Sequence, residues 1–346
     1  MKNKNPRGLF DEELRKEQLT QQGDPLVLLK KMINWEMFRP IITPVFEKEE
    51  RGIGGRPSFD YIMMFKILVL QRYYNLSDDQ IEFQILDRTT FMRFLDLEIS
   101  DKVPDSKTIW LYRENLTEQG IIEKLFTRFH LELERLGYVG NEGKMVDASF
   151  VEVPRQRNNR EENKQIKEGQ TPEEWKNKPH KLSQKDIDAR WTKKNHVTFY
   201  GYKHHVKADT KSKLIEKYEV TPASVHDSNE LENLLDEKDE GQDFHADSAY
   251  TGEDQEKTIK KVKMKNCVNE KGYKNKPLTD KQKSNNKAKS KIRARVEHVF
   301  GFIENSMNGS FIRTIGIKRA KAVIGLMNLT YNIFRYIQLQ KVSFIG

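Results

Sequence analysis

The sequence predicts a mixed α/β domain that is preceded by an all-helical N-terminal domain. From Pro25 to about Gly137, apolar residues recur at helical spacing. At Gly140 the pattern changes to extended, β-branched segments, which first follow one another and then alternate with helices. A chain of 346 residues is long enough for two domains and at least one sizeable core. Strands that meander and then alternate with helices favour a single mixed sheet.

The N-terminal part is expected to be a mobile polar tail, residues 1–24, followed by a helical domain, residues 25–137. Two early helices each carry an apolar face, formed by Leu26, Leu29, Ile33 and Phe38 and by Ile62, Phe65, Leu68, Val69 and Tyr73. Ser77 begins a capping pattern for a further helix, and Asp105 or Ser106 caps another. Short helices joined by tight turns are typical of a helix-turn-helix-like DNA reader and equally of a plain helical bundle.

The remaining residues, 138–346, are expected to form the α/β domain. Five strands are predicted, at 143–153, 197–209 and 214–223, at a segment that ends at Asp247, and around 266–269. Helices are predicted at 228–235, from Thr251 with a capping box, at 280–306 and at 318–340. Residues 155–196 form a charged insertion. Because residues 155–190 have no apolar rhythm, we expect this part to be partly disordered or ordered only by a ligand.

The charge of the chain indicates a polyanionic partner. The formal net charge is +9 and the pI is near 9.2, which favours nucleic acid or an acidic membrane. Residues 257–295 contain 15 Lys/Arg and two Asp/Glu, and residues 155–213 contain 16 and eight. One such run is often only a solvated surface, but two runs that flank the same central segment favour a phosphate-binding surface.

Several other classes of protein are excluded. The single cysteine, Cys267, cannot form a disulfide within the chain, which fits a reducing cytoplasm. The longest aliphatic run, residues 67–70, is far too short to span a membrane, and the first residues lack an apolar signal core. We therefore expect a soluble, cytoplasmic protein. No Walker loop, HExxH, CxxC or GxSxG motif is present. His204 and His205 would point to opposite faces of a strand and so would not share a metal.

Three carboxylates occupy positions that suit catalysis. Asp147 lies within a strand segment, Asp247 ends a later strand, and Glu297 lies beside the apolar stripe of a basic helix. Each has a plain alternative: a solvated strand face for Asp147, a turn for Asp247, and a surface ion pair with Arg293 for Glu297. Taken together, three carboxylates suit a pair of divalent cations in phosphoryl transfer, and Mg²⁺ prefers such oxygen ligands.

Several sequence blocks occur in one order along residues 30–340. In the first part these are GRPSFDYIMMFKILVLQRYYNLSDDQIEFQILDRTTFMRFL and PDSKTIWLYRENL. In the second part they are MVDASFVEVP, DIDARWTKKN, YGYKHHVKAD, VTPASVHDSNEL, ADSAYTG and RARVEHVFGFI. In these blocks and their order the chain resembles bacterial insertion-sequence transposases of the DDE type, specifically the insertion-sequence-five family.

The resemblance implies an RNase H-like catalytic domain in which the first and fourth strands are neighbours. Asp147, Asp247 and Glu297 would then be the catalytic residues and the ligands of a two-metal site for Mg²⁺, with Mn²⁺ as a substitute. The implied partner is double-stranded DNA, both at element ends with inverted repeats and at a target. A homodimer or larger assembly on DNA and a nucleoid-associated location are also expected.

Arg293 matches the Arg of the family's Arg-x-x-x-Glu helix motif and would contact end DNA or order Glu297. The other basic residues expected to contact DNA are Lys107, Arg113, Lys203, Lys287, Lys289, Lys291 and Arg295. The family pattern also has a Tyr three residues before this Arg and a Lys or Arg seven residues after the Glu. At these two positions the chain has Ser290 and Glu304, and an acid at Glu304 would repel phosphate.

The activity implied by the resemblance is metal-dependent cleavage at element ends, after which the freed 3′ hydroxyl attacks target DNA. Two alternatives stay open. The first is an RNase H-like nuclease that does not join strands, and the second is a catalytically silent DNA-binding regulator. An acidic-membrane-binding protein is disfavoured because no long basic amphipathic helix with a large apolar face stands out.

Overall fold

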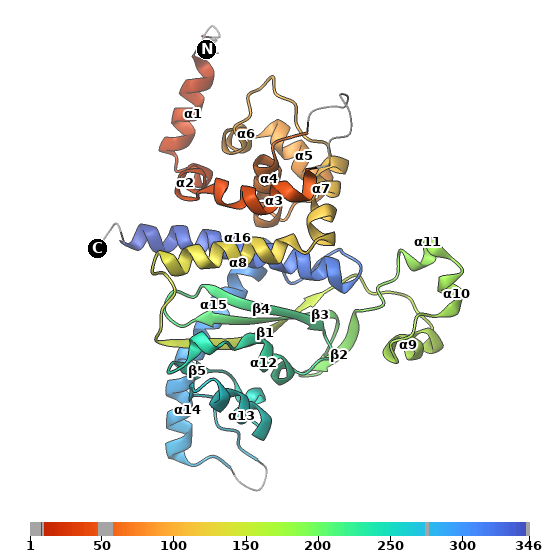
Figure 1. The fold of residues 1–346 in the computed structure, drawn as a ribbon, viewed down its shortest axis with the longest axis vertical. Helices are drawn as coiled ribbons and strands as arrows, with labels where there is room; N and C mark the ends of the chain where they lie inside the picture. Colours follow the sequence, from red (N-terminus) through yellow and green to blue (C-terminus); the bar gives the residue numbers. More distant parts are fainter. Residues whose placement is uncertain (1–7, 9, 48–57, 274–276, 344–346) are drawn as a thin grey trace, which may run out of the picture. The chain divides into compact units, whose positions relative to one another are not determined.

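The computed structural model describes residues 8, 10–47, 58–273 and 277–343 (Figure 1). It separates into two compact units, Met1–Ile121 with Ile337–Gly346, and Ile122–Tyr336. Three parts of the sequence-based expectations lie outside the described residues: most of the first nine residues of the expected mobile tail, residues 55–57 of the first family block, and Lys274 and Lys276 of the basic stretch.

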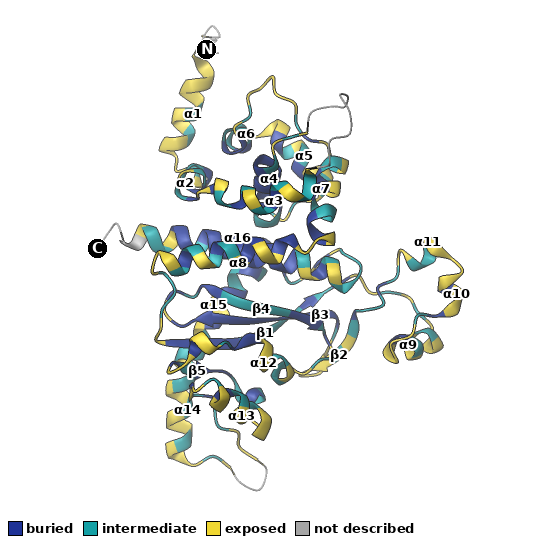
Figure 2. Cartoon of the chain, viewed as in Figure 1, coloured by how far each residue is buried: buried dark blue, intermediate teal, exposed yellow. Residues whose placement is uncertain are grey.

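The first unit is helical, as the sequence predicts. Its helices are α1 (Asp11–Gln21), α2 (Pro25–Met32), η1 (Trp35–Phe38), α3 (Arg39–Phe46), α4 (Tyr61–Tyr73), α5 (Asp78–Asp87), α6 (Thr89–Leu95) and α7 (Ser106–Glu118). The predicted caps are confirmed, since Ser77 and Gln80 form a capping box and Asp105 accepts from the Thr108 amide at 2.7 Å. Within the expected mobile tail, residues 11–21 form the exposed helix α1 (Figure 2).

The core of the first unit surrounds α4, in which residues 62–71 are all buried. Trp35 packs edge-on against Phe65 and Phe94, with ring centroids 6.0 and 5.6 Å apart. A helix that is buried all round has no polar face, which explains why its apolar residues exceed a single stripe.

The second unit contains a mixed sheet. Its strands are β1 (Gly143–Glu152), β2 (Arg190–Lys194), β3 (Val197–Asp209), β4 (Ile215–Pro222), β5 (Asp243–His245) and β6 (Lys265–Asn266). The order is β2-β3-β1-β5-β6, with β4 also paired to β3. β1 is antiparallel to β3 and parallel to β5. The mixed α/β expectation is therefore confirmed, and the first and fourth predicted strands, β1 and β5, are neighbours.

The described sheet has six strands and not the expected five, because β2 lies inside the predicted insertion. β2 pairs with β3 through the two-residue loop Asn195-His196, and both loop residues have positive φ, 48° and 66°. These angles are those of a type I′ hairpin turn, which usually carries Asn-Gly. Because histidine occupies the second position, the sequence lacks the Asn-Gly pattern that predicts this turn. β2 is an exposed edge strand with little apolar alternation, so it was not predicted as a strand.

The insertion also contains short helices where we expected partial disorder. These are α9 (Arg160–Lys167), α10 (Glu173–Lys176) and α11 (Pro179–Leu182). They surround Trp175, which is fully buried, and its ring nitrogen donates to Glu162 at 2.7 Å. One central aromatic residue orders the segment, and a single residue produces no apolar rhythm in the sequence.

Helices cover both faces of the sheet. The face that carries Val146, Phe244 and Ala246 packs against α12 (Leu231–Leu234), against Tyr250 and against α13 (Glu253–Lys261). The opposite face carries Met145, Asp147 and Ser149, together with their cross-strand neighbours on β3. It is covered by α8 (Ile121–Arg135), α14 (Asp280–Arg293), η5 (Ala294–Val296), α15 (Glu297–Gly301), η6 (Phe302–Ser306) and α16 (Ile317–Ser343). The helices α8, α14, α15 and α16 are labelled in Figure 1.

Two predicted helices differ in detail. The capping box at Thr251 is wrong: α13 begins at Glu253 after Gly252, which makes no side-chain cap, and the Thr251 hydroxyl donates to the Ser248 carbonyl at 2.7 Å. The predicted helix 280–306 is helical throughout but changes type. It is 3₁₀ over Ala294–Val296, α-helical again over Glu297–Gly301, and a π turn over Phe302–Ser306. The last predicted helix, 318–340, corresponds to α16.

Candidate active site

Asp147 lies in the middle of the central strand β1. Its neighbour on β3 is Val206, and its side chain is 19% exposed. The adjacent Val146 belongs to the core on the other face, so the alternation of β1 turns Asp147 towards α14 and η5. The solvated strand face that was the plain alternative does not fit a side chain this buried.

The register of two parallel strands brings Asp247 beside Asp147. Gly143 pairs with Asp243, and Met145 pairs with His245. Continued by two residues, the same register places Asp247 opposite Asp147, and adjacent strands lie about 4.8 Å apart. Asp247 has extended backbone angles, φ −76° and ψ 176°, and therefore continues the direction of β5.

Asp247 also begins a turn. Its Oδ1 accepts a hydrogen bond from the Ala249 amide at 2.7 Å, at the start of η4 (Ser248–Tyr250). Only one carboxylate oxygen is used in this bond. The turn interpretation and the ligand interpretation are therefore compatible for the same side chain, because a carboxylate has several lone-pair directions.

The electrostatic surroundings of Asp147 favour a nearby cation. Burial, with a smaller contribution from the negative charge of Asp247, raises the pKa of Asp147 to about 6. The Ala148 amide, which donates to Oδ1 at 2.9 Å, and the Arg293 guanidinium lower this pKa but do not offset burial. Two neighbouring carboxylates that repel each other are the arrangement that a divalent cation stabilises.

Arg293 connects the strand carboxylate to the helix carboxylate. One of its terminal nitrogens lies 3.1 Å from Oδ2 of Asp147, and the other lies 3.8 Å from Oε1 of Glu297. Glu297 is 66% exposed. The structure therefore brings Asp147, Asp247 and Arg293 together and places Glu297 at the open edge of this group.

A different group of possible metal ligands includes two residues of β5 and the nearby Cys267. Asp243, His245 and Cys267 have donor atoms within 4.8 Å of one another, the one such trio found among the described residues. This mixed O, N and S donor set suits a softer ion than Mg²⁺. Burial lowers the pKa of His245, and the charges of Lys289 and Arg295 lower it further. Lys265 lies 3.8 Å from Asp243. These cations oppose a bound dication.

The adjacent histidines of β3 are core residues. His204 contacts Phe300, and His205 exchanges a hydrogen bond with the Thr221 hydroxyl on the opposite face. Burial lowers the pKa of His204 to about 3 and that of His205 to about 4. They are therefore neutral and do not form a shared metal site, as their adjacency in the strand predicts.

The expected DNA-contacting residues fall into two groups. Lys107, Lys287 and Lys291 are exposed, and the structure describes no hydrogen bond or ion pair of their ammonium groups. Lys289 donates to the Val268 carbonyl at 2.9 Å and Arg295 to the Thr210 carbonyl at 3.0 Å. Both keep a charge that no carboxylate neutralises among the described residues.

The two other expected contacts are engaged inside the protein. Lys203 is buried and pairs with Asp227 at 2.7 Å. The Arg113 guanidinium forms a two-pronged pair with Asp78, at 2.6 and 2.8 Å. A sequence count of positive charges does not distinguish these structural cations from free ones.

The two departures from the family pattern also have partners within the chain. The Ser290 hydroxyl accepts from the Asn269 side chain at 2.8 Å. The Ser149 hydroxyl donates to Glu304 at 2.8 Å. Because Ser149 is two residues from Asp147, Glu304 lies over the same face of β1. The hydrogen bond between Ser149 and Glu304 links the π turn η6 to the central strand β1.

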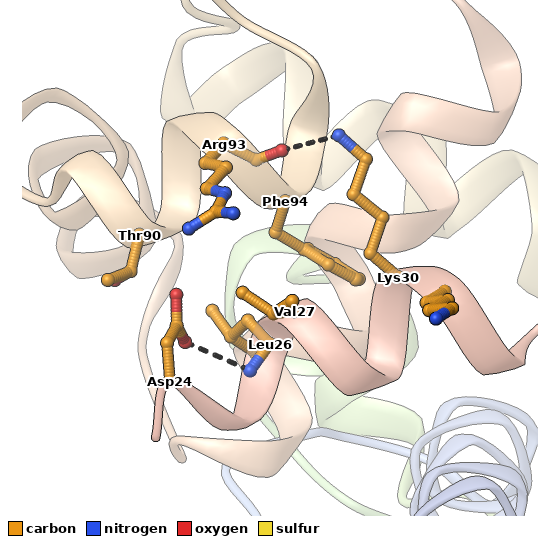
Figure 3. A pocket seen from close by; sticks show the side chains of 8 residues that line it. Asp24, Leu26, Val27, Lys30, Thr90, Arg93 and Phe94 are labelled. Atoms are coloured by element: carbon orange, nitrogen blue, oxygen red, sulfur yellow. Dashed lines mark hydrogen bonds between the residues drawn. The ribbon is translucent and has the colours of Figure 1, made fainter. Parts of the chain in front are cut away.

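A hollow of about 340 Å³ in the first unit was not predicted from the sequence (Figure 3). Leu26, Val27 and Phe94 form apolar walls, and Lys30, Lys31 and Arg93 add positive charge. Lys30 donates to the Arg93 carbonyl at 2.7 Å and also pairs with Asp96. The residues come from α2 and α6, whose packing could not be read from periodicity alone.

A mixed sheet with neighbouring acidic strands, an Arg-Glu helix across its face and exposed lysines defines a DNA-processing enzyme with an RNase H-like fold. Comparison with protein families supports this class. Residues 140–333 match the family described as Transposase DDE domain, and residues 14–115 match the Transposase domain (DUF772). The chain belongs to the DDE transposase family.

Membership of this family implies a DNA partner and the use of a divalent metal. The insertion-sequence-five branch stays a prediction. No solved structure matches the chain. Across the described residues, no helix combines the length and the apolar character needed to cross a membrane.

Proposed function

We propose that this transposase cleaves DNA at the ends of an insertion element and joins the freed 3′ ends to target DNA, with Asp147, Asp247 and Glu297 as its catalytic carboxylates. The observation that carries the proposal is the parallel register of β1 and β5, which pairs Met145 with His245. Extended by two residues, this register would place Asp147 opposite Asp247. Two carboxylates on adjacent central strands, under a helix that supplies a third, fit phosphoryl transfer.

The donor set fits Mg²⁺, which prefers carboxylate oxygens. Asp147 and Asp247 would together hold one metal ion, and Glu297 would complete the ligands of the second metal ion. When bound, the metal activates the attacking oxygen and stabilises the leaving oxygen. Mn²⁺ has similar ligand preferences and is expected to substitute.

The residues of the chain have separate tasks in this proposal. Arg293 favours the ionised form of Asp147 and reaches Glu297, so it would position both carboxylates. Lys287 and Lys291 lie on the exposed side of α14 and would contact the DNA backbone near the cleaved bond. Lys107 would contact DNA from the first unit. Two ends must meet for joining, so we expect a dimer or larger assembly on DNA.

The proposal is tested with duplex DNA that carries the inverted repeats flanking the gene. Wild-type protein with Mg²⁺ should nick this DNA at the repeat boundary, and Asp247→Asn should bind it without cutting. A second assay supplies a pre-cleaved end with target DNA. Cleavage without joined product would instead identify a nuclease, and binding without any metal-dependent cleavage would identify a regulator.

A further inference from the structure

A second hollow, of about 370 Å³, lies in the second unit at the base of the insertion. Three chain segments meet there: the residues that follow β1, the end of the insertion and the residues that precede α16. It is lined by Val153, Pro154, Arg155, Gln156, Arg157, Lys181, Gln184, Lys185, Asp186, Arg313, Thr314 and Ile315. None of these residues belongs to the carboxylate site.

The lining of this hollow is strongly basic. It contains three arginines and two lysines against one carboxylate, Asp186. Asp186 is 2% exposed, and its oxygens accept from the Tyr202 hydroxyl at 2.8 Å and from the Ala189 and Gly316 amides at 2.9 and 3.1 Å. The hydrogen bonds of Asp186 are directed into the protein. Because Lys181 pairs with Glu162 and Glu174 at 3.2 and 3.5 Å, the positive excess of the lining comes from the three arginines and Lys185.

The three arginines are available to a ligand. Arg155, Arg157 and Arg313 are exposed, and no carboxylate of a described residue forms an ion pair with them. Arg155 lies over the ring of Trp191, with its guanidinium carbon 5.6 Å from the centroid, and this contact leaves its N–H groups free. Lys185, in contrast, is held by the Arg157 carbonyl and the Asn158 side chain at 3.0 and 2.6 Å.

Two polar atoms in the lining have no partner. The Thr314 hydroxyl and the Gln156 side-chain oxygen are buried and make no hydrogen bond with any described residue. A buried polar atom without a partner is destabilising, so such atoms usually receive a hydrogen bond from a ligand or water. The hydroxyl of Thr314 can donate to a phosphate oxygen, and Gln156 can accept from a bridging water.

The hollow is built on ordered supports. Arg190, at the start of β2, donates to the Ile166 carbonyl of α9 at 2.8 Å. Lys181 and Lys185 lie over the buried ring of Trp175 at 5.7 and 5.0 Å. The insertion is thereby fixed to the edge of the sheet, and the cations keep their spacing before a ligand arrives.

We propose that this hollow binds the phosphodiester backbone of the DNA that the carboxylate site cleaves, through Arg155, Arg157, Arg313 and the Thr314 hydroxyl. The inference rests on the proposed function for the identity of the polyanion. Six residues of strand separate Asp147 from Val153, a distance of roughly 20 Å. For a DNA axis that runs along β1 with a rise of ~3.4 Å per nucleotide, the contacted phosphate would lie roughly six nucleotides from the cleaved bond.

The test compares the triple variant Arg155→Ala/Arg157→Ala/Arg313→Ala with a control that also removes three exposed charges outside the two basic runs, Lys124→Ala/Arg135→Ala/Lys238→Ala. Affinity for end-containing duplex DNA is measured from 50 to 300 mM salt, and ethylation interference maps the contacted phosphates. The triple variant should bind at least tenfold more weakly at ~0.1 M salt, and its salt slope should fall by about 2–3. The control should match wild type.

Equal losses in both variants, or no loss in the arginine variant, would overturn the inference, as would unchanged interference about six nucleotides from the cut. Circular dichroism and the thermal midpoint confirm that the exposed substitutions leave the fold intact. If wild type cleaves DNA and the arginine variant shows no specific loss, only the hollow is refuted. If wild type neither binds nor cleaves DNA, the proposed function fails as well.

Discussion

The Arg293 guanidinium lies 3.1 Å from Asp147 and 3.8 Å from Glu297, so one basic side chain joins the central strand to the helix that covers it. Sequence spacing predicts only the pair with Glu297, four residues away. The longer connection, across 146 residues of chain, shows that α14 and its 3₁₀ continuation face the acidic part of the sheet.

Asp147→Asn is expected to stabilise the metal-free protein above pH 6. Folding raises the pKa of Asp147 to about 6, so the folded state retains a proton that the unfolded state loses from about pH 4 upwards. The neutral carboxyl therefore favours the fold at low pH, and this advantage is lost as the pH rises through 6. Asparagine removes this penalty, which amounts to at most about 3 kcal/mol at pH 8. Chemical denaturation at pH 4 and pH 8 measures this; equal differences at both values would contradict the assignment.

Arg293→Ala is expected to move the acid limb of the cleavage pH profile to higher pH. Arg293 stabilises the ionised form of Asp147, and its removal raises the pKa of that carboxyl. The control is Arg295→Ala on the same helical run, because Arg295 contacts the Thr210 carbonyl and no described carboxylate. Both variants lose one charge for DNA. If the acid limb shifts equally in both variants, or in neither, Arg293 does not control the pKa of Asp147.

Lys107 and Arg113 lie on the same helix, α7, and are expected to act differently. Arg113→Ala leaves the half-buried Asp78 without its partner and should lower the free energy of unfolding by about 1–3 kcal/mol. Lys107→Ala should leave stability unchanged and weaken DNA binding, since its ammonium group is exposed. Urea unfolding and DNA titration of both variants give the comparison. If Arg113→Ala keeps its stability but binds DNA more weakly, Arg113 contacts DNA and the structural role is wrong.

Much of the fold follows from local patterns that survive in the structure. The helical unit, the caps at Ser77 and Asp105, and strands β1, β3 and β4 all correspond to predicted elements. What escaped prediction depends on single residues. His196 replaces the glycine usual in the hairpin before β3, and Gly252 takes the N-cap position of α13, where Thr251 was expected.

The candidate site was only partly accessible from sequence. The types and positions of the carboxylates, with the family resemblance, led to Asp147 and Asp247, and the register of β1 with β5 supports their proximity. The partners of the cations could not be predicted, because the ion pairs of Lys203 and Arg113 join segments 24 and 35 residues apart. The hollow at the base of the insertion likewise needs three distant segments.

The most direct test of the central claim is single-turnover cleavage of end DNA by Asp247→Asn, beside the matched control Asp243→Asn on the same strand. Extension of the register of β1 with β5 by two residues would place Asp247 opposite Asp147, whereas Asp243 pairs with Gly143 at the other end of β5. The account predicts that Asp247→Asn cleaves roughly 10³-fold more slowly with either Mg²⁺ or Mn²⁺, at unchanged DNA affinity, and that Asp243→Asn cleaves like wild type. Wild-type cleavage by Asp247→Asn would contradict it.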